Sequence, residues 1–316
     1  MILRNVGQLV LVSVMGGLFA PDATLLEWQA GLGSMPVFMS VARARHLPEA
    51  ADRQAPVPMK IDAESYGVGI GADAAVVIDA RSGALLYAKG PEEVRSIGSI
   101  TKAMTALVYL EAAPDLEEMV VIRNEDILFG GRIYLQTNDA LRARDVLAAA
   151  MIGSDNSASK ALINLSGLSE EDFISRMNTK AKELGMITTT FVDPSGLSAN
   201  NTSSARDIAL LLAEVAKHED LTSLMTRSEI TIRQASGFAA TITSTNTLLT
   251  TLPDGYEITA GKTGFLPQAG YCFMAAFEHE GNDVYVVVLG SDEIDGRFAD
   301  AQSLALWTYQ TFAWPE

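Results

Sequence analysis

The chain has 316 residues, of which 48% are hydrophobic, so its length suits one large domain or two small ones with a substantial core. Its formal net charge of -16 argues against nucleic-acid binding, because phosphate contacts need clustered lysine and arginine. The single cysteine, Cys272, excludes an internal disulfide and falls in a strand-like run, where a small core residue is expected.

The first residues have the pattern of an export signal. Arg4 precedes an apolar stretch over residues 6–19, which has the length of a signal-peptide core and is short for a membrane span. Pro21 directly follows Ala20, which makes a poor cleavage site. Residues 1–23 are therefore predicted to be a signal peptide or an uncleaved anchor, and the protein to be exported to the periplasm or cell envelope.

Residues 24–68 are predicted to be a linker. They contain four of the chain's prolines and show no sustained periodicity, which is typical of an extended or loosely packed segment. The sequence assigns no function to this part. The folded domain is expected to occupy residues 69–316.

Within that domain, strands are expected at both ends and helices between them. Residues 74–79, a turn at 81–83 and residues 84–88 predict a hairpin. The region from 99 to 226 is rich in helix-like segments, such as residues 144–152 and 204–216. Strand-like runs return in the last third, at residues 261–265, 271–277 and 284–289, followed by a helix at 297–312. This order predicts an α+β (mixed α/β) fold with one antiparallel sheet built from both chain ends.

The segment Ser99-Ile-Thr-Lys102 opens one of these helices. On a helix, a hydroxyl and an amine three residues apart share one face. The following run, residues 103–110, is mostly apolar and indicates a helix buried nearly all round. Burial lowers the pKa of a lysine, which suits Lys102 to act as a base toward Ser99. The structural alternatives are a helix N-cap for Ser99 and a snorkelling surface lysine.

Two further motifs distinguish this S-x-x-K match from chance. A second match at residues 157–160 lies in a more polar setting, and S-x-N also recurs at 198–200 and 244–246. Only the match at Ser99 is followed in order by S-D-N at residues 154–156 and by the single K-T-G at 262–264. This order and spacing are those of penicillin-recognising serine enzymes. As plain structure, the S-D-N segment would be a polar turn or N-cap.

On these residues the chain resembles the low-molecular-mass penicillin-binding proteins, the serine D-alanyl-D-alanine peptidases. The resemblance covers roughly residues 70 to 312, including segments 94–106, 191–197, 202–207 and 269–272. It is closest to the short, single-domain endopeptidase type, because the chain ends soon after the catalytic domain should end. It implies the β-lactamase/transpeptidase-like fold, with peptidoglycan peptides and β-lactam antibiotics as ligands.

The resemblance also implies catalytic roles for three side chains. Ser99 would be the nucleophile, forming an acyl-enzyme with the carbonyl of a D-Ala peptide bond. Lys102 would be the general base, and Ser154 would relay a proton to the leaving amine.

Five further residues are implied in substrate binding. Asn156 would hydrogen-bond the substrate backbone and order the catalytic lysine, and Lys262 and Thr263 would bind the substrate carboxylate from an edge strand. Gly264 would let a ligand approach that strand closely. The oxyanion hole is expected from the backbone N–H groups of Ser99 and Phe265.

Two other functions are alternatives for this motif pattern. A β-lactamase of the same fold would need a glutamate in an E-x-x-x-N segment, and Glu170, Glu171 and Glu183 are not followed by asparagine at that spacing. A non-catalytic peptidoglycan-binding protein would not need a buried lysine beside a serine. No metal or other cofactor is expected, since the three histidines are scattered and no dinucleotide fingerprint occurs. The N-terminal segment suggests peripheral membrane or envelope association, and the oligomeric state stays open.

Overall fold

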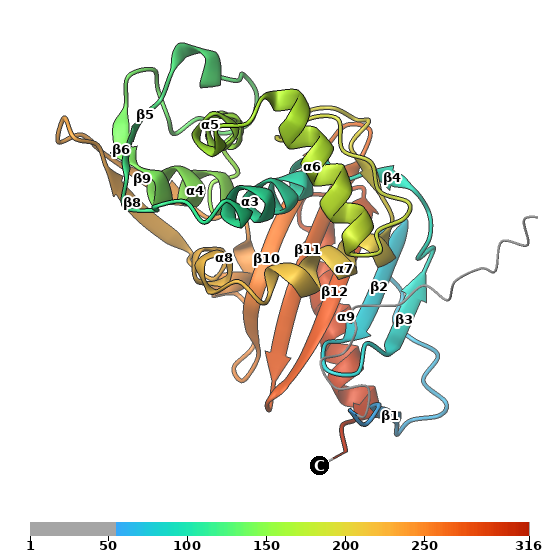
Figure 1. The fold of residues 1–316 in the computed structure, drawn as a ribbon. Helices are drawn as coiled ribbons and strands as arrows, with labels where there is room; N and C mark the ends of the chain where they lie inside the picture. The colour runs from blue at the N-terminus through green and yellow to red at the C-terminus, as the bar shows by residue number, and fades with distance from the viewer. Residues whose placement is uncertain (1–54, 316) are drawn as a thin grey trace, which may run out of the picture. The chain divides into compact units, whose positions relative to one another are not determined.

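A five-stranded antiparallel sheet with order β10-β11-β12-β2-β3 organises the computed structural model, which describes residues 55–315 (Figure 1). Its strands are β2 (Ala74–Asp79), β3 (Leu85–Lys89), β10 (Glu257–Leu266), β11 (Gly270–His279) and β12 (Asn282–Ser291). β12 pairs with β2, from Val284 opposite Asp79 to Leu289 opposite Ala74. This pairing joins strands from the two ends of the domain, so the predicted sheet and the α+β class are confirmed.

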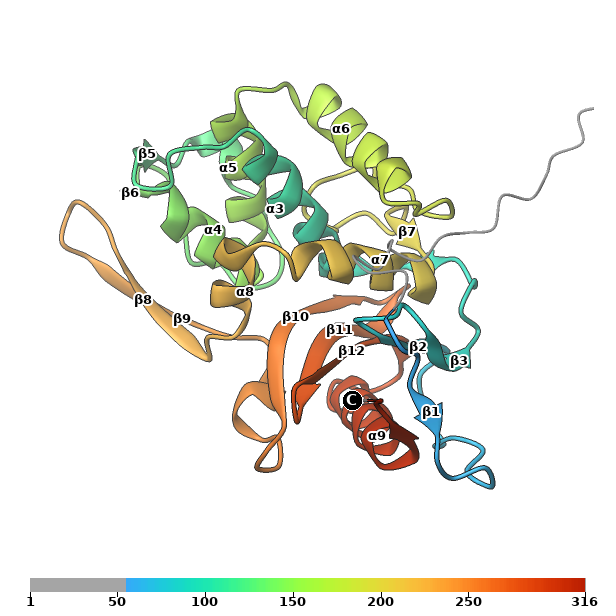
Figure 2. The same cartoon turned by 60° about the horizontal axis from the view of Figure 1, so that its bottom comes forward.

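Both faces of the sheet are buried, which explains why its central strands are continuous apolar runs. Successive residues of β2 point to opposite faces, so Val76 and Val77 belong to two different core clusters. Figure 2 shows α7 (Ala205–Val215) and α9 (Gly296–Thr311) on opposite faces of the sheet, and both contact β12. The predicted helices over 204–216 and 297–312 correspond to these two.

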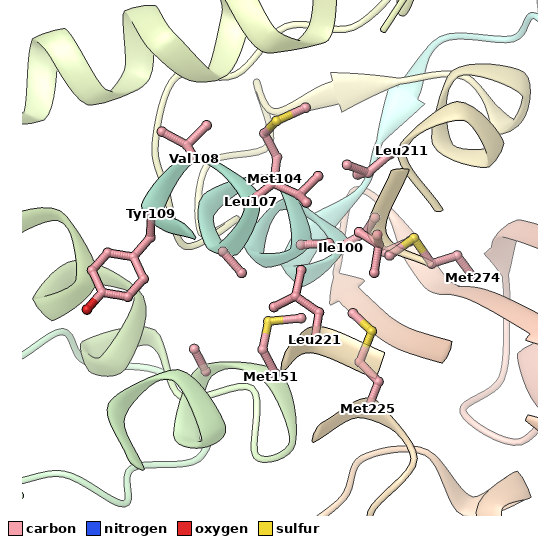
Figure 3. Close-up of a cluster of buried hydrophobic side chains, with 14 of the residues drawn as sticks. Ile100, Met104, Leu107, Val108, Tyr109, Met151, Leu211, Leu221, Met225 and Met274 are labelled. Carbon is pink, nitrogen blue, oxygen red and sulfur yellow. The ribbon is translucent and has the colours of Figure 1, made fainter. Parts of the chain in front are cut away.

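A helical region lies between the two groups of strands, as predicted. Besides α7 it contains α3 (Thr101–Glu111), α4 (Ala143–Met151), α5 (Asn156–Ser166), α6 (Glu170–Glu183) and α8 (Glu219–Met225). Helix α3 is buried along most of its length, as its apolar composition indicated. Figure 3 shows why: Met104 and Leu107 of α3 lie among side chains from α4, α7, α8 and β11.

Short elements complete the domain. The two-stranded pairs are β1 (Met59–Lys60) with β13 (Phe312–Ala313), β4 (Arg95–Ser96) with β7 (Thr202–Ser203), β5 (Met119–Val121) with β6 (Ala140–Arg142), and β8 (Glu229–Arg233) with β9 (Ala239–Thr243). The 3-10 turns are η1 (Gly98–Ile100), η2 (Asn124–Asp126) and η3 (Thr247–Thr250). The β4–β7 pair matters for the site, because β4 leads directly into η1, the turn that carries Ser99.

The predictions for the N-terminal part fall mostly outside the described residues. This holds for the signal peptide or anchor at 1–23 and for residues 24–54 of the predicted linker. The rest of that linker includes β1, which pairs with β13 near the C-terminus. Among the described residues, no helix combines the length and apolar character needed to cross a membrane. Cys272 is buried in β11, as expected of a core residue.

Candidate active site

Ser99 and Lys102 meet where the turn η1 runs into α3. The Lys102 Nζ donates a hydrogen bond to the Ser99 Oγ at 2.8 Å. The lysine side chain has no solvent exposure, which rules out the snorkelling alternative. The N-cap positions of η1 and α3 are Ile97 and Ile100, so the Ser99 hydroxyl caps neither helix. Its hydroxyl is therefore held by the lysine.

Burial changes the acidity of Lys102. Desolvation lowers its pKa from the usual 10.5 to about 7, although the negative charges of Asp155 and Asp193 oppose this shift. The amine has three acceptors, one for each ammonium hydrogen: Ser99 Oγ, Asn156 Oδ1 at 2.7 Å and the Ser195 carbonyl oxygen. Loss of one proton leaves a lone pair for the serine hydroxyl and keeps two bonds that hold the amine in place. Lys102 thus has the pKa and the geometry of a general base.

The S-D-N segment links α4 to α5 and contributes to both structure and site. Ser154 has a positive φ of 60°, which is uncommon for a residue with a side chain. Asp155 is the N-cap of α5 and accepts a hydrogen bond from the Ala158 N–H at 3.1 Å. Asn156 begins the helix and orders Lys102 through its side-chain oxygen, as the resemblance implied. The S-D-N segment is therefore both a turn with a helix N-cap, at Asp155, and part of the site, through Asn156.

The K-T-G segment lies on β10, the edge strand of the sheet, in agreement with the prediction. Lys262 donates from Nζ to the Ser154 Oγ at 2.8 Å. Desolvation holds the pKa of Lys262 well below its usual range, and the positive charges of Lys102 and Arg297 add to this effect. The Thr263 hydroxyl lies 2.6 Å from the Thr245 hydroxyl. The site thus contains two serine–lysine pairs, one at the nucleophile and one at Ser154.

Glycines let the backbone of η1 pack directly on β10. A Cβ on Gly264 would lie 2.3 Å from the Ile97 carbonyl oxygen, and one on Gly98 would lie 2.8 Å from the Phe265 nitrogen. The prediction explained Gly264 by ligand approach, whereas the close neighbour in the structure is the chain's own backbone. This contact places the Ser99 turn beside Phe265, the two residues from which an oxyanion hole was expected.

Sequence reasoning missed contacts made through backbone carbonyls. The Ser195 carbonyl accepts from Lys102, and the Gly130 carbonyl accepts from the Asn156 side-chain amide at 2.8 Å. Ser195 lies in segment 191–197, which is part of the family resemblance, but any residue type has a backbone carbonyl, so the sequence does not reveal this acceptor. Arg297 was also missed; its Nη1 donates to the Gly264 carbonyl at 3.1 Å, from the first turn of α9.

Comparison with known proteins identifies similar chains. A family model described as D-alanyl-D-alanine carboxypeptidase matches residues 60–293. A D-alanyl-D-alanine endopeptidase from Escherichia coli is 33% identical over 240 residues, covering 75% of this chain and 77% of the relative. A D-alanyl-D-alanine endopeptidase from Pseudomonas aeruginosa is 30% identical over 279 residues, with 87% of each chain covered.

Solved structures extend this likeness to the fold. The Streptomyces K15 DD-transpeptidase superposes with a TM-score of 0.73 at 27% identity, covering 78% of this chain and 100% of its own. Penicillin-binding protein D2 from Listeria monocytogenes, in its cefotaxime-bound form, gives a TM-score of 0.68 at 30% identity, with 78% and 100% covered. The expected β-lactamase/transpeptidase-like fold is thereby confirmed.

Proposed function

The chain belongs to the D-alanyl-D-alanine carboxypeptidase family of serine peptidases, and we propose that it hydrolyses peptidoglycan peptides through an acyl-enzyme on Ser99. The observation that carries this assignment is the hydrogen bond from the buried Lys102 amine to the Ser99 hydroxyl. A pKa of about 7 leaves this amine neutral in a large fraction of molecules at neutral pH. Such a lysine can take the serine proton without help from a histidine.

In the acylation step, neutral Lys102 accepts the proton of Ser99 as the serine oxygen attacks the carbonyl carbon of a D-Ala residue. The carbonyl π electrons move to oxygen, and the N–H groups of Ser99 and Phe265 stabilise that oxyanion. When the oxyanion collapses, the carbon–nitrogen bond breaks and the leaving amine takes the Ser154 hydroxyl proton, which the Lys262 ammonium replaces. Water then attacks the ester carbonyl and loses its proton through Ser154 to the neutral Lys262. The ester carbon–oxygen bond breaks as the Ser99 oxygen takes back the proton held by Lys102, which restores the free enzyme.

The second serine–lysine pair is suited to the leaving group. Both kinds of substrate carry a carboxylate next to the scissile amide, either on terminal D-Ala or on the D-centre of a cross-linking diamino acid. We assign recognition of that carboxylate to Lys262 and Thr263, with Asn156 contacting the substrate backbone. A bound carboxylate beside Lys262 favours its charged form, which supports proton transfer through Ser154.

We also propose that cross-linked peptides are substrates. Two relatives of at least 30% identity, both covered over more than three quarters of their length, are named D-alanyl-D-alanine endopeptidases. Other relatives are named carboxypeptidases, and the site residues serve both reactions. Incubation with a purified cross-linked muropeptide dimer and, separately, with a monomeric pentapeptide tests this. Release of monomers from the dimer supports the endopeptidase assignment, whereas loss of terminal D-Ala alone contradicts it.

A substrate in the cell wall requires export of the enzyme. We propose that residues 1–23 serve as the signal peptide or anchor, 24–68 as the linker and 69–316 as the catalytic domain in the periplasm or envelope. Cell fractionation followed by N-terminal sequencing tests the location and the cleavage together. Recovery of the protein in the cytosol with Met1 intact would contradict the proposal.

Intact mass after exposure to benzylpenicillin tests the nucleophile. The wild type should gain one persistent penicilloyl adduct, and Ser99→Ala should gain none. PBP D2 from Listeria monocytogenes, which has been solved with ampicillin bound, supports this choice of probe. An intact antibiotic without adduct would favour a non-catalytic binder. Consumed antibiotic without adduct would favour the β-lactamase alternative.

A further inference from the structure

Asp193 gathers an unusual number of hydrogen bonds on one carboxylate. Its Oδ1 accepts from the N–H groups of Ser195 at 2.7 Å and Gly196 at 2.8 Å, and from the Ser195 hydroxyl at 2.7 Å. Its Oδ2 accepts from the Ser198 N–H at 2.8 Å. The side chain therefore holds residues 193–198 in a tight turn by accepting hydrogen bonds from its backbone N–H groups. We call this segment the Asp193 turn.

The Asp193 turn contacts the nucleophile at two points. The Ser195 carbonyl accepts a hydrogen bond from Lys102 Nζ, as described above. Gly196 has a φ of 81°, and a Cβ on it would lie 2.1 Å from the Gly98 oxygen and 2.9 Å from the Ser99 nitrogen. The turn thus packs against the peptide that carries Ser99, and Phe265 of β10 packs against the same peptide at Gly98. Its position limits where the nucleophile and its base can lie.

Two polar side chains fasten the Asp193 turn to α3. Asn201 is fully buried and donates from Nδ2 to the Asp193 carbonyl at 2.9 Å and to Thr101 Oγ1 at 3.1 Å. Thr105 donates from its hydroxyl to the Pro194 carbonyl at 2.6 Å. Thr101 and Thr105 flank Lys102 on α3, so the turn is tied to the helix on both sides of the base.

We propose that Asp193 is a positioning residue for the Ser99–Lys102 pair: its carboxylate holds the turn that presents the Ser195 carbonyl to Lys102 and seats Gly196 against Ser99. The inference rests on the proposed function, because it assigns Asp193 to the step in which Ser99 is acylated. Asp193 touches neither substrate nor the reacting atoms in this role. It acts through the backbone of the turn.

The negative charge of Asp193 also affects the pKa of Lys102, separately from its hydrogen bonds to the turn. Lys102 is faced by the carboxylates of Asp155, at the start of α5, and Asp193, and by the ammonium of Lys262 on β10. The two carboxylates raise the pKa of Lys102 against the larger effect of burial. Replacing Asp193 by asparagine removes one negative charge and keeps an acceptor for the N–H groups of Ser195 and Gly196, while the acceptor that faces the Ser198 N–H and the Asn201 amide is lost. The pKa of Lys102 should then fall further.

Acylation by a fluorescent penicillin, measured against pH, tests the proposal in the full chain. Asp193→Ala should lower the acylation rate constant by about 100-fold, because the reacting groups lose a fixed geometry. Asp193→Asn should retain much more of the rate and shift the pH midpoint of acylation down, because one of the two charges that raise the pKa of Lys102 is removed. Asp207→Asn is the matched control. Asp207 is buried and accepts hydrogen bonds from the Thr188 N–H at 2.8 Å and the Thr189 hydroxyl at 2.9 Å, away from Lys102.

The outcomes separate this inference from the proposed function. If the wild type is not acylated while folded, the proposed function fails. If the wild type is acylated and Asp193→Ala matches it in rate, the positioning role is wrong. The role is also wrong if Asp207→Asn, at an equal loss of melting temperature, reduces acylation as much as Asp193→Ala, since stability alone would then explain both. A rate loss confined to the Asp193 variants, together with the shifted midpoint, supports the proposal.

Discussion

The chain contains two S-x-x-K segments, at residues 99–102 and 157–160, and the surroundings of their lysines differ completely. At the first, Lys102 is fully buried and its amine faces the Ser99 hydroxyl. At the second, Lys160 on α5 is partly exposed and pairs with Glu170, while the Ser157 hydroxyl bonds the backbone of Leu128. The same residue types at the same spacing thus hold a buried amine against a serine hydroxyl in one place and form a surface ion pair in the other.

The comparison shows that the chemistry comes from the environment rather than from the spacing. The Lys160 amine pairs with the Glu170 carboxylate near the surface and makes no hydrogen bond to the Ser157 hydroxyl. Burial of Lys102 favours its neutral form, while Asn156 and the Ser195 carbonyl hold the amine beside the hydroxyl. A lysine base therefore needs desolvation and neutral acceptors together.

Removing each lysine should produce the largest contrast. Lys102→Met should reduce the rate of acylation by penicillin by ~100- to 10,000-fold, because the serine loses its general base. Lys160→Met should acylate at the wild-type rate, because its amine contacts only Glu170 on the surface. Stopped-flow labelling of both variants measures this, with circular dichroism to verify folding. Equal rates for the two variants would remove Lys102 from the mechanism.

Replacing Ser154 of the S-D-N motif and Ser157 of the second S-x-x-K segment should give a smaller contrast in the rate of peptide hydrolysis. Ser154→Ala should slow peptide hydrolysis by about 100-fold, since Ser154 connects Lys262 to the leaving amine. Ser157→Ala removes a hydroxyl that bonds only to Leu128 and should leave hydrolysis unchanged. Steady-state hydrolysis of a D-Ala-D-Ala peptide distinguishes them. A Ser154→Ala enzyme with unchanged kcat/KM would contradict the relay.

The order of the motifs was enough to choose between the two segments, and the geometry agrees with that choice. The strand-like runs predicted the sheet, because the apolar segments that form β2 and β12 indicate buried strands at both ends of the domain. The local patterns located α4, α7 and α9 with each boundary off by one residue. These features depend on side-chain type and periodicity, which a sequence displays directly.

Other parts of the site depend on backbone geometry and stayed hidden. Two such contacts are the hydrogen bond from Lys102 to the Ser195 carbonyl and the packing of Gly196 against Gly98. Both form only because the segment that begins at residue 193 folds back onto the Ser99 turn. No residue type encodes a carbonyl acceptor. Arg297 was read only as the start of a helix, because its contact with Gly264 arises from packing of α9 against β10. Long-range contacts made through the main chain are therefore what the sequence could not supply.

The pH dependence of acylation should follow Lys102 rather than any surface lysine. Since the neutral amine is active and its pKa is about 7, the rate should rise about tenfold per pH unit below 7 and level off above. The unfolded lysine titrates near 10.5, so the unfolded state binds more protons between pH 7 and 10.5. The Lys102 contribution to the free energy of unfolding therefore rises with pH across that interval. Acylation rates from pH 5 to 9 check the midpoint; a rate that falls as pH rises would contradict a neutral base.

The smallest effect is expected at the ion pair of the second segment. Lys160 and Glu170 are partly exposed, with 17% and 48% of their side chains accessible, so solvent screens their attraction. Glu170→Gln should lower the free energy of unfolding by less than ~1 kcal/mol and leave acylation unchanged. Urea unfolding of this variant beside Lys160→Met measures the pair, and the double variant should match the single ones if the two residues act only on each other. A loss of acylation in Glu170→Gln would mean that the second segment communicates with Ser99 through α5, whose first residue is Asn156. The contrast between a catalytic and a structural S-x-x-K would then no longer hold.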